Sequence, residues 1–327
     1  MKHPRIALIG ARRVRQGLGP YVARDLAGHG AEIPAVLGTT RPTAEAAARD
    51  LQQYGIECRP YADLDQLLDC EQLDALAILS PPETHEGYLR QALAADLHVL
   101  CEKPLIWGRE GLAARTATLT EQFRKRGLVL FENCQWPFVL PAFNALHPGA
   151  LAEPLERFEM WLSPTTLGEE MLRDSMSHPL SLLQALRPDP APGVGAIEFR
   201  EVPGRLTVRA EYRTAAAAVP FEVEFQQSLS VPRKAGLAVN GRRAERLVRG
   251  GDYSMFFSSG DESVEIDDPL GILLGRFVRE LASGSGSQGP GGAFATEGIA
   301  SRMEMLQAVL QAYRLAYGRG NVDARDS

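Results

Sequence analysis

The sequence predicts an α/β protein in two parts: a doubly wound parallel sheet over residues 1–128, and an α+β domain with a large, open, mainly antiparallel sheet over residues 129–327. Up to about residue 130, short apolar runs alternate with amphipathic stretches, as in βαβ units with helices on both faces of a parallel sheet. Beyond residue 150, strand-like runs follow one another with short turns and often alternate apolar with polar residues, as in an antiparallel sheet with one wet face. A length of 327 residues also favours two domains.

The first part contains a regular series of expected strands and helices. Residues 76–79 are continuously apolar, which is typical of a central parallel strand covered on both sides. The expected strands lie at residues 5–9, 33–38, 57–61, 73–80, 98–102 and 128–134, and the expected helices at 21–30, 42–55, 63–73, 83–97 and 109–127.

The second part is rich in expected strands. Helix-like stretches interrupt them at 167–186 and close the chain at 297–316, and the run SGSGSQGPGG at 283–292 is a flexible loop by composition. The arginine-rich run at 242–249 fits a solvated strand or turn. The expected strands lie at 155–163, 196–202, 205–214, 219–229, 236–241 and 262–267.

Composition narrows the class of protein. With 45% hydrophobic and 23% charged residues the chain can bury a core, and its net charge of −6 argues against nucleic-acid binding. Its four scattered cysteines suit a reducing compartment and offer no metal spacing. No apolar stretch is long enough to span a bilayer, and the first strand begins too early to leave room for a signal peptide. We therefore expect a cytoplasmic protein with neither a membrane nor a nucleic-acid partner.

The expected strand at 98–102 runs into Glu102-Lys103-Pro104. Ligands bind beyond the carboxyl ends of the strands in sheets of this type. An ammonium group there can transfer a proton or hydrogen-bond a reacting hydroxyl or carbonyl. A salt bridge at a strand end explains the same residues equally well.

The wider stretch SPPETHEGYLRQALAADLHVLCEKPL, residues 80–105, resembles the signature region of the glucose–fructose oxidoreductase / inositol dehydrogenase (Gfo/Idh/MocA) family. That region has a strand ending in a small residue and prolines, a Thr-His at the start of the next helix, and a His-Val strand leading into Glu-Lys-Pro. The resemblance implies a Rossmann domain followed by an open-sheet domain. It also implies a nicotinamide cofactor near Ser80, Pro81, His85, Glu102 and Lys103.

A second group of polar residues lies in MLRDSMSHPLSLLQAL, residues 171–186. Pro179 suits the first turn of a helix, so His178 is expected at a helix N-terminus, where the dipole favours a neutral imidazole that can accept a proton. The resemblance implies that Asp174 and His178 form a catalytic set with Lys103. Relatives often have an aspartate where this chain has Ser181, which leaves polyol recognition open. From the residues alone, Asp174 and His178 could simply cap a helix.

The stretch FENCQWPFVLP, residues 131–141, is expected to be a strand that leaves the first domain. The resemblance implies substrate contacts here, at Asn133, Gln135 and Trp136. A tryptophan would make the substrate pocket flat and apolar, although it serves core packing equally well.

The turn after the first strand reads LIGARRVRQGLG, residues 8–19. A dinucleotide-binding loop has a second glycine for close approach to the pyrophosphate and a third for helix packing. Here those positions hold Arg12 and Arg15, and Gly17 and Gly19 stand too far along the sequence to replace them. We expect Gly10, Ala11, Arg12 and Arg13 to contact the cofactor, with arginine gripping a phosphate.

The end of the second strand indicates which cofactor is used. Proteins selective for NAD usually place a carboxylate there to bind the ribose hydroxyls. This chain has Thr39, Thr40 and Arg41, two hydroxyls and a guanidinium, which suit a 2′-phosphate. NADP(H) is therefore the preferred cofactor, with NAD(H) as the alternative; capping of the next helix is compatible with both.

The sequence predicts an NADP(H)-dependent oxidoreductase for a small sugar-, polyol- or ketone-like substrate, with Lys103 and His178 as the proton-transfer groups. Two alternatives remain: an imine or tetrapyrrole reductase of the same family, and a non-catalytic ligand sensor or scaffold. The apolar face of strands such as VPFEVEF, residues 219–225, together with the resemblance, implies a homodimer or homotetramer through the C-terminal sheet.

Overall fold

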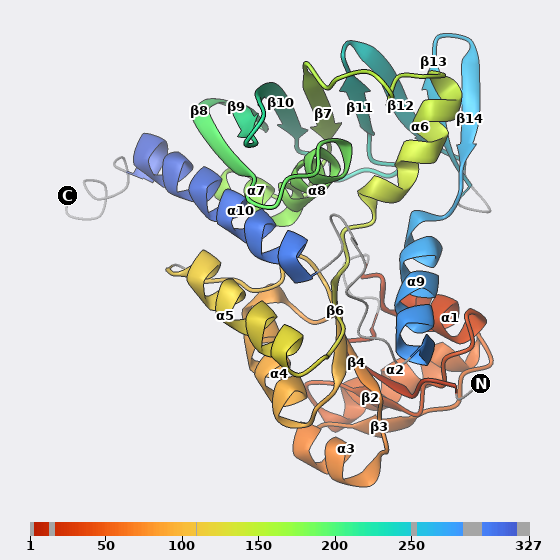
Figure 1. Ribbon diagram of the computed structural model, residues 1–327. Coiled ribbons are helices and arrows are strands. Elements are labelled where there is room, and N and C mark those ends of the chain that lie inside the picture. Colours follow the sequence, from red (N-terminus) through yellow and green to blue (C-terminus); the bar gives the residue numbers. More distant parts are fainter. Residues whose placement is uncertain (1–2, 13–16, 109, 250–253, 284–295, 319–327) are drawn as a thin grey trace, which may run out of the picture. The chain divides into compact units, whose positions relative to one another are not determined.

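The computed structural model describes residues 3–12, 17–108, 110–249, 254–283 and 296–318 (Figure 1). The chain divides into two compact units. The first comprises residues 1–133 and 270–299, and the second comprises 134–269 and 300–327. This division differs from the expected boundary after residue 128 in one main respect, because a segment near the C-terminus belongs to the first unit.

The first unit contains a six-stranded parallel sheet with helices on both faces, as predicted. The strand order is β3-β2-β1-β4-β5-β6, so the order reverses between β1 and β4. Helices α1 and α2 contact each other, and α4 and α5 form a second pair across the sheet (Figure 1). The strands are β1 (Ile6–Ile9), β2 (Ala35–Leu37), β3 (Arg59–Tyr61), β4 (Ala75–Ile78), β5 (His98–Cys101) and β6 (Leu130–Glu132). The helices are α1 (Gly19–Gly28), α2 (Arg41–Gln52), α3 (Leu64–Cys70), α4 (Pro82–Ala94) and α5 (Leu112–Lys125).

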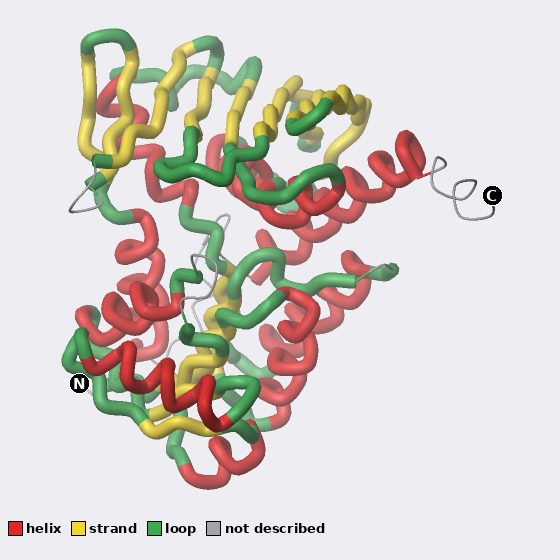
Figure 2. The backbone as a smooth tube through the Cα atoms, turned by 180° about the vertical axis from the view of Figure 1, so that it is seen from behind, coloured by secondary structure: helices red, strands yellow, loops and turns green. Residues whose placement is uncertain are grey.

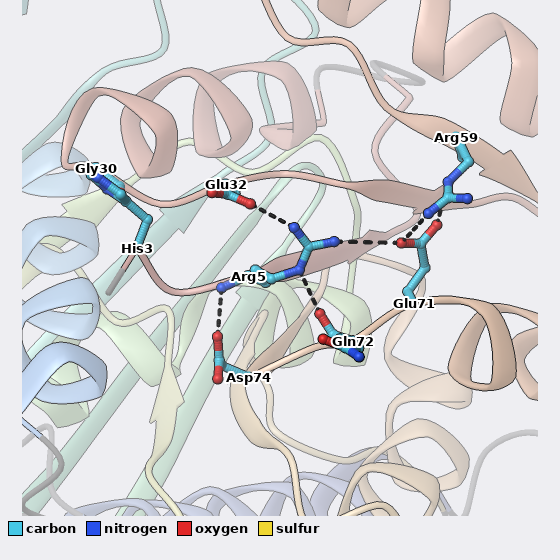
Figure 3. Close-up of polar contacts among 8 residues, drawn as sticks. All are labelled: His3, Arg5, Gly30, Glu32, Arg59, Glu71, Gln72 and Asp74. Atoms are coloured by element: carbon cyan, nitrogen blue, oxygen red, sulfur yellow. Dashed lines mark hydrogen bonds and ion pairs between the residues drawn. The ribbon is translucent and has the colours of Figure 1, made fainter. Parts of the chain in front are cut away.

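A buried carboxylate links several residues at the end of the sheet where its strands begin. Glu71, whose side chain is fully buried, forms ion pairs with Arg59 at 2.6 Å and with Arg5 at 3.6 Å (Figure 3). Tyr61 donates a hydrogen bond to the same carboxylate, and burial together with this bond raises the pKa of Tyr61 to about 12. Arg5 also donates to the carbonyl of Gln72, so β1, β3 and the end of α3 are cross-linked at the edge away from the expected ligand crevice.

Helix α9 (Pro269–Ser283) is the part of the chain that returns to the first unit. The ring of Phe277 lies 5.4 Å from that of Phe131 in β6. The imidazole of His29, at the end of α1, contacts the carbonyl of Gly271 at 2.9 Å. A Cβ at Gly275 would lie only 2.7 Å from that imidazole, so a glycine lets α9 approach α1 closely.

The second unit contains an eight-stranded, mainly antiparallel sheet, as predicted. Its order is β14-β13-β12-β11-β7-β10-β9-β8, and only β7 and β10 pair in parallel. Helices lie along one face of the sheet (Figures 1 and 2). The strands are β7 (Phe158–Leu162), β8 (Gly193–Val202), β9 (Arg205–Arg213), β10 (Ala218–Gln226), β11 (Ala235–Val239), β12 (Arg242–Val248), β13 (Met255–Ser259) and β14 (Glu262–Ile266).

Two regions of this unit differ from the sequence expectation, and the last helix agrees with it. Residues after Glu132 were expected to continue as a strand, but they form the 3₁₀ helix η1 (Trp136–Val139) and α6 (Leu140–Leu146). The expected helix at 167–186 is two helices, α7 (Glu169–Ser175) and α8 (Ser177–Leu186). They are separated at Met176 because Pro179 has no N–H to donate back to α7. The last helix is α10 (Thr296–Tyr317), and all but Ser283 of the expected flexible loop lies outside the described residues.

The two faces of the second sheet differ in chemistry. Val219, Phe221, Val223 and Phe225 of β10 are all buried on the covered face. The apolar face cited as the reason for oligomerisation is therefore already covered within the unit. The open face carries glutamates and arginines instead.

Candidate functional site

The strand-order reversal between β1 and β4 is where a ligand crevice is expected in a sheet of this topology. Gly10 directly follows β1 and has a φ of +81°. A Cβ at Gly10 would lie 2.9 Å from the backbone N and Cα of Ser80, which lies two residues beyond the end of β4. Both the backbone conformation and the close approach therefore require glycine at position 10.

The turn after Gly10 keeps only part of the usual glycine pattern. Ala11 is buried and Arg12 is exposed, whereas Arg13 lies outside the described residues. A Cβ at Gly19, the first residue of α1, would collide with the carbonyl of Ala11. The spacing in the sequence did not predict this close approach of Gly19 to Ala11. Gly19 supplies the close approach of helix and turn.

The end of β2 has no carboxylate, as the sequence requires. Thr40 is the N-cap of α2, since its side chain accepts from the N–H of Thr43 and the Thr43 hydroxyl accepts from the N–H of Thr40. The exposed guanidinium of Arg41 donates to Glu45 and to the carbonyl of Pro60, both at 2.9 Å. Thr39 is exposed beside them. The capping role therefore exists, and it leaves the Arg41 side chain at the surface.

His85 connects the loops that follow β4 and β5. Its fully buried ring contacts the carbonyl of Ser80 through Nε2 at 2.7 Å and the carbonyl of Pro104 through Nδ1 at 3.1 Å. A neutral imidazole has one N–H, so it can donate to one of the two carbonyls. The Thr84 hydroxyl holds the carbonyl of Pro81 at 2.7 Å in the same turn. His85 thus positions both loops from within the core.

The loop after β5 carries the expected lysine. Lys103 is half-buried, and its peptide bond to Pro104 is cis. Glu102 accepts a hydrogen bond of 2.7 Å from the side-chain amide of Asn133, whose own Oδ1 is buried with no hydrogen-bond partner among the described residues. The fully buried Glu132, which sequence reasoning did not single out, accepts from the N–H of Leu105 at 2.8 Å. The signal that could have identified Glu132 in the sequence is an acidic residue at the end of an apolar strand.

The second unit contains Asp174 and His178. His178 is the second residue of α8 and is half-buried, in the first helical turn as expected. The carboxylate of Asp174 accepts hydrogen bonds from Thr166 and from Arg173, both at 3.0 Å. The Ser181 hydroxyl donates to the carbonyl of His178 at 2.8 Å, so this serine supports the turn that carries the imidazole.

Trp136 lies beside this histidine within the second unit. Its ring centroid is 6.2 Å from that of His178, and the guanidinium carbon of Arg246 lies 5.4 Å from the Trp136 ring. The tryptophan is 6% exposed, so it is largely packed, and Gln135 precedes it at the N-cap of η1. Sequence reasoning assigned no role to Arg246. The alternation along β12 was the missed signal, because Arg246 shares a face with the buried Ala244.

The described residues contain no group of three or more histidine, cysteine or acidic side chains that could hold a metal ion. Among the helices of that part of the chain, none combines the length and hydropathy needed to cross a bilayer.

Comparison with protein families gives one match, between residues 4–133 and the family described as "Oxidoreductase family, NAD-binding Rossmann fold". The chain resembles an inositol 2-dehydrogenase of Arthrobacter sp. (strain FB24), with 35% identity over 101 residues, or 31% of this chain and 28% of that protein. It also resembles a dTDP-3,4-didehydro-2,6-dideoxy-alpha-D-glucose 3-reductase of Streptomyces violaceoruber, with 39% identity over 31% of this chain and 27% of that protein. The matches span less than a third of these two relatives.

Solved structures show the same fold over nearly the whole chain. KijD10, a 3-ketoreductase from Actinomadura kijaniata solved with NADP, has a TM-score of 0.69 and 18% identity over 95% of this chain and 97% of its own. GenD2 from gentamicin A biosynthesis, solved with NAD, has a TM-score of 0.71 and 15% identity over 98% and 96% of the two chains.

Proposed function

The chain belongs to the Gfo/Idh/MocA family, and on that premise we propose that it is an NADP(H)-dependent oxidoreductase. It transfers hydride between nicotinamide and a C–OH/C=O carbon of a small sugar-like substrate. The observation that carries the proposal is the reversal of strand order between β1 and β4, where Gly10 lies against the backbone of Ser80. His85 connects the loop after β4 with Glu102-Lys103-Pro104, so these two segments of the first unit form one structural group.

The residues at this edge fit a dinucleotide. A turn with no side chain at Gly10 lets a pyrophosphate approach the backbone, and the exposed Arg12 adds a positive charge. Arg41 already pairs with Glu45, but an exposed pair is worth only about 0–1 kcal/mol. A charge-assisted bond to a phosphate is worth about 1.5–3 kcal/mol. The 2′-phosphate of NADP(H) should therefore win the guanidinium from Glu45.

The proposed proton chemistry belongs to Lys103, Asp174 and His178. The bound nicotinamide would supply or accept the hydride. In the oxidation direction His178 accepts the proton of the substrate hydroxyl, and the Lys103 ammonium donates a hydrogen bond to a substrate oxygen. Asp174 orients the substrate or the ring. These residues are assigned to one reaction because both of their motifs resemble the family.

The proposed substrate class rests on the relatives. Both matched relatives are named for polyol or deoxysugar substrates, and KijD10 is named a 3-ketoreductase. Relatives oxidising or reducing a sugar carbon favour a sugar or polyol over an imine.

Titration with NADPH and NADH, followed by nicotinamide fluorescence, tests the cofactor. Arg41→Ala should weaken NADPH binding about tenfold or more, the equivalent of 1.4 kcal/mol, and leave NADH binding unchanged. Glu45→Gln is the matched control, because it removes the competing carboxylate and should keep or strengthen NADPH binding. An equal loss for both nucleotides in Arg41→Ala would show that the 2′-phosphate is not held here.

Turnover tests the rest of the proposal. Wild-type protein should oxidise NADPH with a ketosugar or reduce NADP with a polyol, and Lys103→Met should retain nucleotide binding with a rate reduced at least a hundredfold. Nucleotide binding without turnover of any sugar, polyol, ketone or imine would favour the ligand sensor instead.

A further inference from the structure

Arg246 is a cation in an apolar setting. It lies on β12 and pairs with Ala235 of β11 and Phe257 of β13, both of which are buried. Ala244, two residues earlier on the same face, is fully buried, whereas the neighbouring Leu247 is 51% exposed. Arg246 therefore points to the covered face of the sheet, where the other strands contribute apolar side chains.

The guanidinium has little internal compensation. Nη2 donates a long hydrogen bond of 3.3 Å to the carbonyl of Arg233, and Nε is buried without a hydrogen-bond partner. Within the described ranges, Arg246 forms no ion pair with a carboxylate. Burial and the positive charge of Arg233 both lower the pKa of Arg246. An arginine normally has five N–H donors to satisfy, so this one keeps donors for a group outside the protein.

The buried carboxylate of Glu71 shows the compensated case, since it has ion pairs with two arginines and a hydrogen bond from Tyr61. Leaving a half-buried cation without a carboxylate partner costs folding free energy, and such costs are typical of binding sites.

Arg246 lies near His178, the candidate proton-transfer residue of the second unit. Its guanidinium lies over the ring of Trp136, and the imidazole of His178 is the next aromatic neighbour of that ring. All three belong to the second unit, so this arrangement does not depend on how the two units are placed. Arg246 and His178 both lie beside the Trp136 ring, so a ligand group bound by Arg246 would lie near His178.

We propose that Arg246, stacked on Trp136 beside His178, binds an anionic oxygen group of the substrate, a carboxylate or a phosphate. The planar guanidinium suits either group through two parallel N–H···O bonds. The substrate is then an acidic or phosphorylated sugar-like molecule and not a neutral polyol. This inference rests on the proposed function, because it takes the surroundings of His178 to be the substrate site.

The test compares thermal unfolding of wild type, Arg246→Met, Arg246→Lys and Arg243→Met. Inorganic phosphate and acetate are the probes, each against potassium chloride at equal ionic strength. Wild type should gain Tm with phosphate or acetate beyond the effect of chloride, and the more effective anion identifies the group. Arg246→Met should have a Tm equal to or above that of wild type without anion, and should lose the gain. Arg246→Lys should bind the anion at least tenfold more weakly, since it lacks the forked donors.

Arg243→Met is the matched control, because Arg243 is exposed on the opposite face of β12 and stacks on Trp161. It should keep the anion-dependent gain in Tm. No gain in wild type, a gain that persists in Arg246→Met, or a lower Tm of Arg246→Met without anion would each overturn the proposal. NADPH titration of the same variants separates this from the proposed function: wild type and all variants should bind NADPH equally, and a wild type that binds no nucleotide would refute the function itself.

Discussion

Single side chains connect the loops that carry the candidate site, and His85 is the strongest example. Its ring reaches the carbonyls of Ser80 and Pro104 from the core. His85→Phe should fill a similar volume but remove the imidazole N–H that donates to one of these carbonyls, at a cost of about 1–3 kcal/mol in unfolding free energy. Urea unfolding measures the loss, and NADPH affinity should fall with it.

Thr84→Val provides the control for His85→Phe. Thr84 is exposed in the same turn, so water can replace its hydroxyl, and the stability loss should stay below about 1 kcal/mol. Equal losses of unfolding free energy in the two variants would mean that burial of the imidazole does not make its hydrogen bond more stabilising than an exposed one.

A second residue predicts a dependence on pH. Burial lowers the pKa of His98, whose Nδ1 accepts the N–H of Val129 at 2.8 Å, although Asp74 acts in the opposite direction. Because the folded state disfavours the proton, stability is fully present above the unfolded pKa of about 6.5 and is lost as the pH falls below it.

His98→Asn should flatten this dependence. The Asn carbonyl can still accept the N–H of Val129, but the variant has no proton to gain. We expect wild type to lose unfolding free energy between pH 7.5 and 5.5 and the variant to lose less. His3→Asn, at an exposed histidine, should retain the wild-type slope. Parallel pH profiles for wild type and His98→Asn would contradict the assignment.

At the scale of elements, helix α9 completes the first unit. Phe277 is fully buried against Phe131, so Phe277→Ala should cost about 3–5 kcal/mol. Ile272→Ala, on the exposed side of the same helix, should cost far less. Unfolding in denaturant, with NADPH binding as the measured signal, reports on the first unit alone. A loss under 1 kcal/mol for Phe277→Ala would mean that α9 contributes little to that unit.

Sequence patterns predict some elements well and others poorly. The six strands of the first sheet are within a few residues of the expectation, because a parallel strand buried on both faces is a continuous apolar run. The role of Gly19 and the return of α9 were not predictable, since both depend on residues that are distant in sequence and close in space. Strand β12 was ambiguous because its arginines hide the alternation between faces.

At the scale of the whole molecule, the charged residues on the open face of the second sheet bear on how two copies of this chain could associate. The apolar residues of β10 are covered within the unit. The open face carries exposed pairs such as Arg209–Glu222 at 2.6 Å and Arg205–Glu224 at 3.7 Å.

We therefore propose that a homodimer formed through this face is held by charges and is salt-sensitive. Light scattering after size-exclusion chromatography should show a dimer at 50 mM NaCl that dissociates at 500 mM, where charges are screened within a few ångströms. Charge reversal with Glu222→Arg should weaken the dimer at low salt. A dimer or tetramer that persists unchanged at high salt would require a different, apolar surface.

Because α9 belongs to the first unit, that unit cannot be completed until most of the chain has been synthesised. The ribosome synthesises residues 1–133 first, yet the unit they form also includes residues 270–283 of α9. The aromatic contact at Phe131 therefore waits until more than a hundred further residues have been made. A nascent chain halted after residue 133 should expose this unfinished surface to chaperones and proteases, and only nearly full-length chains should acquire protease resistance in their first half.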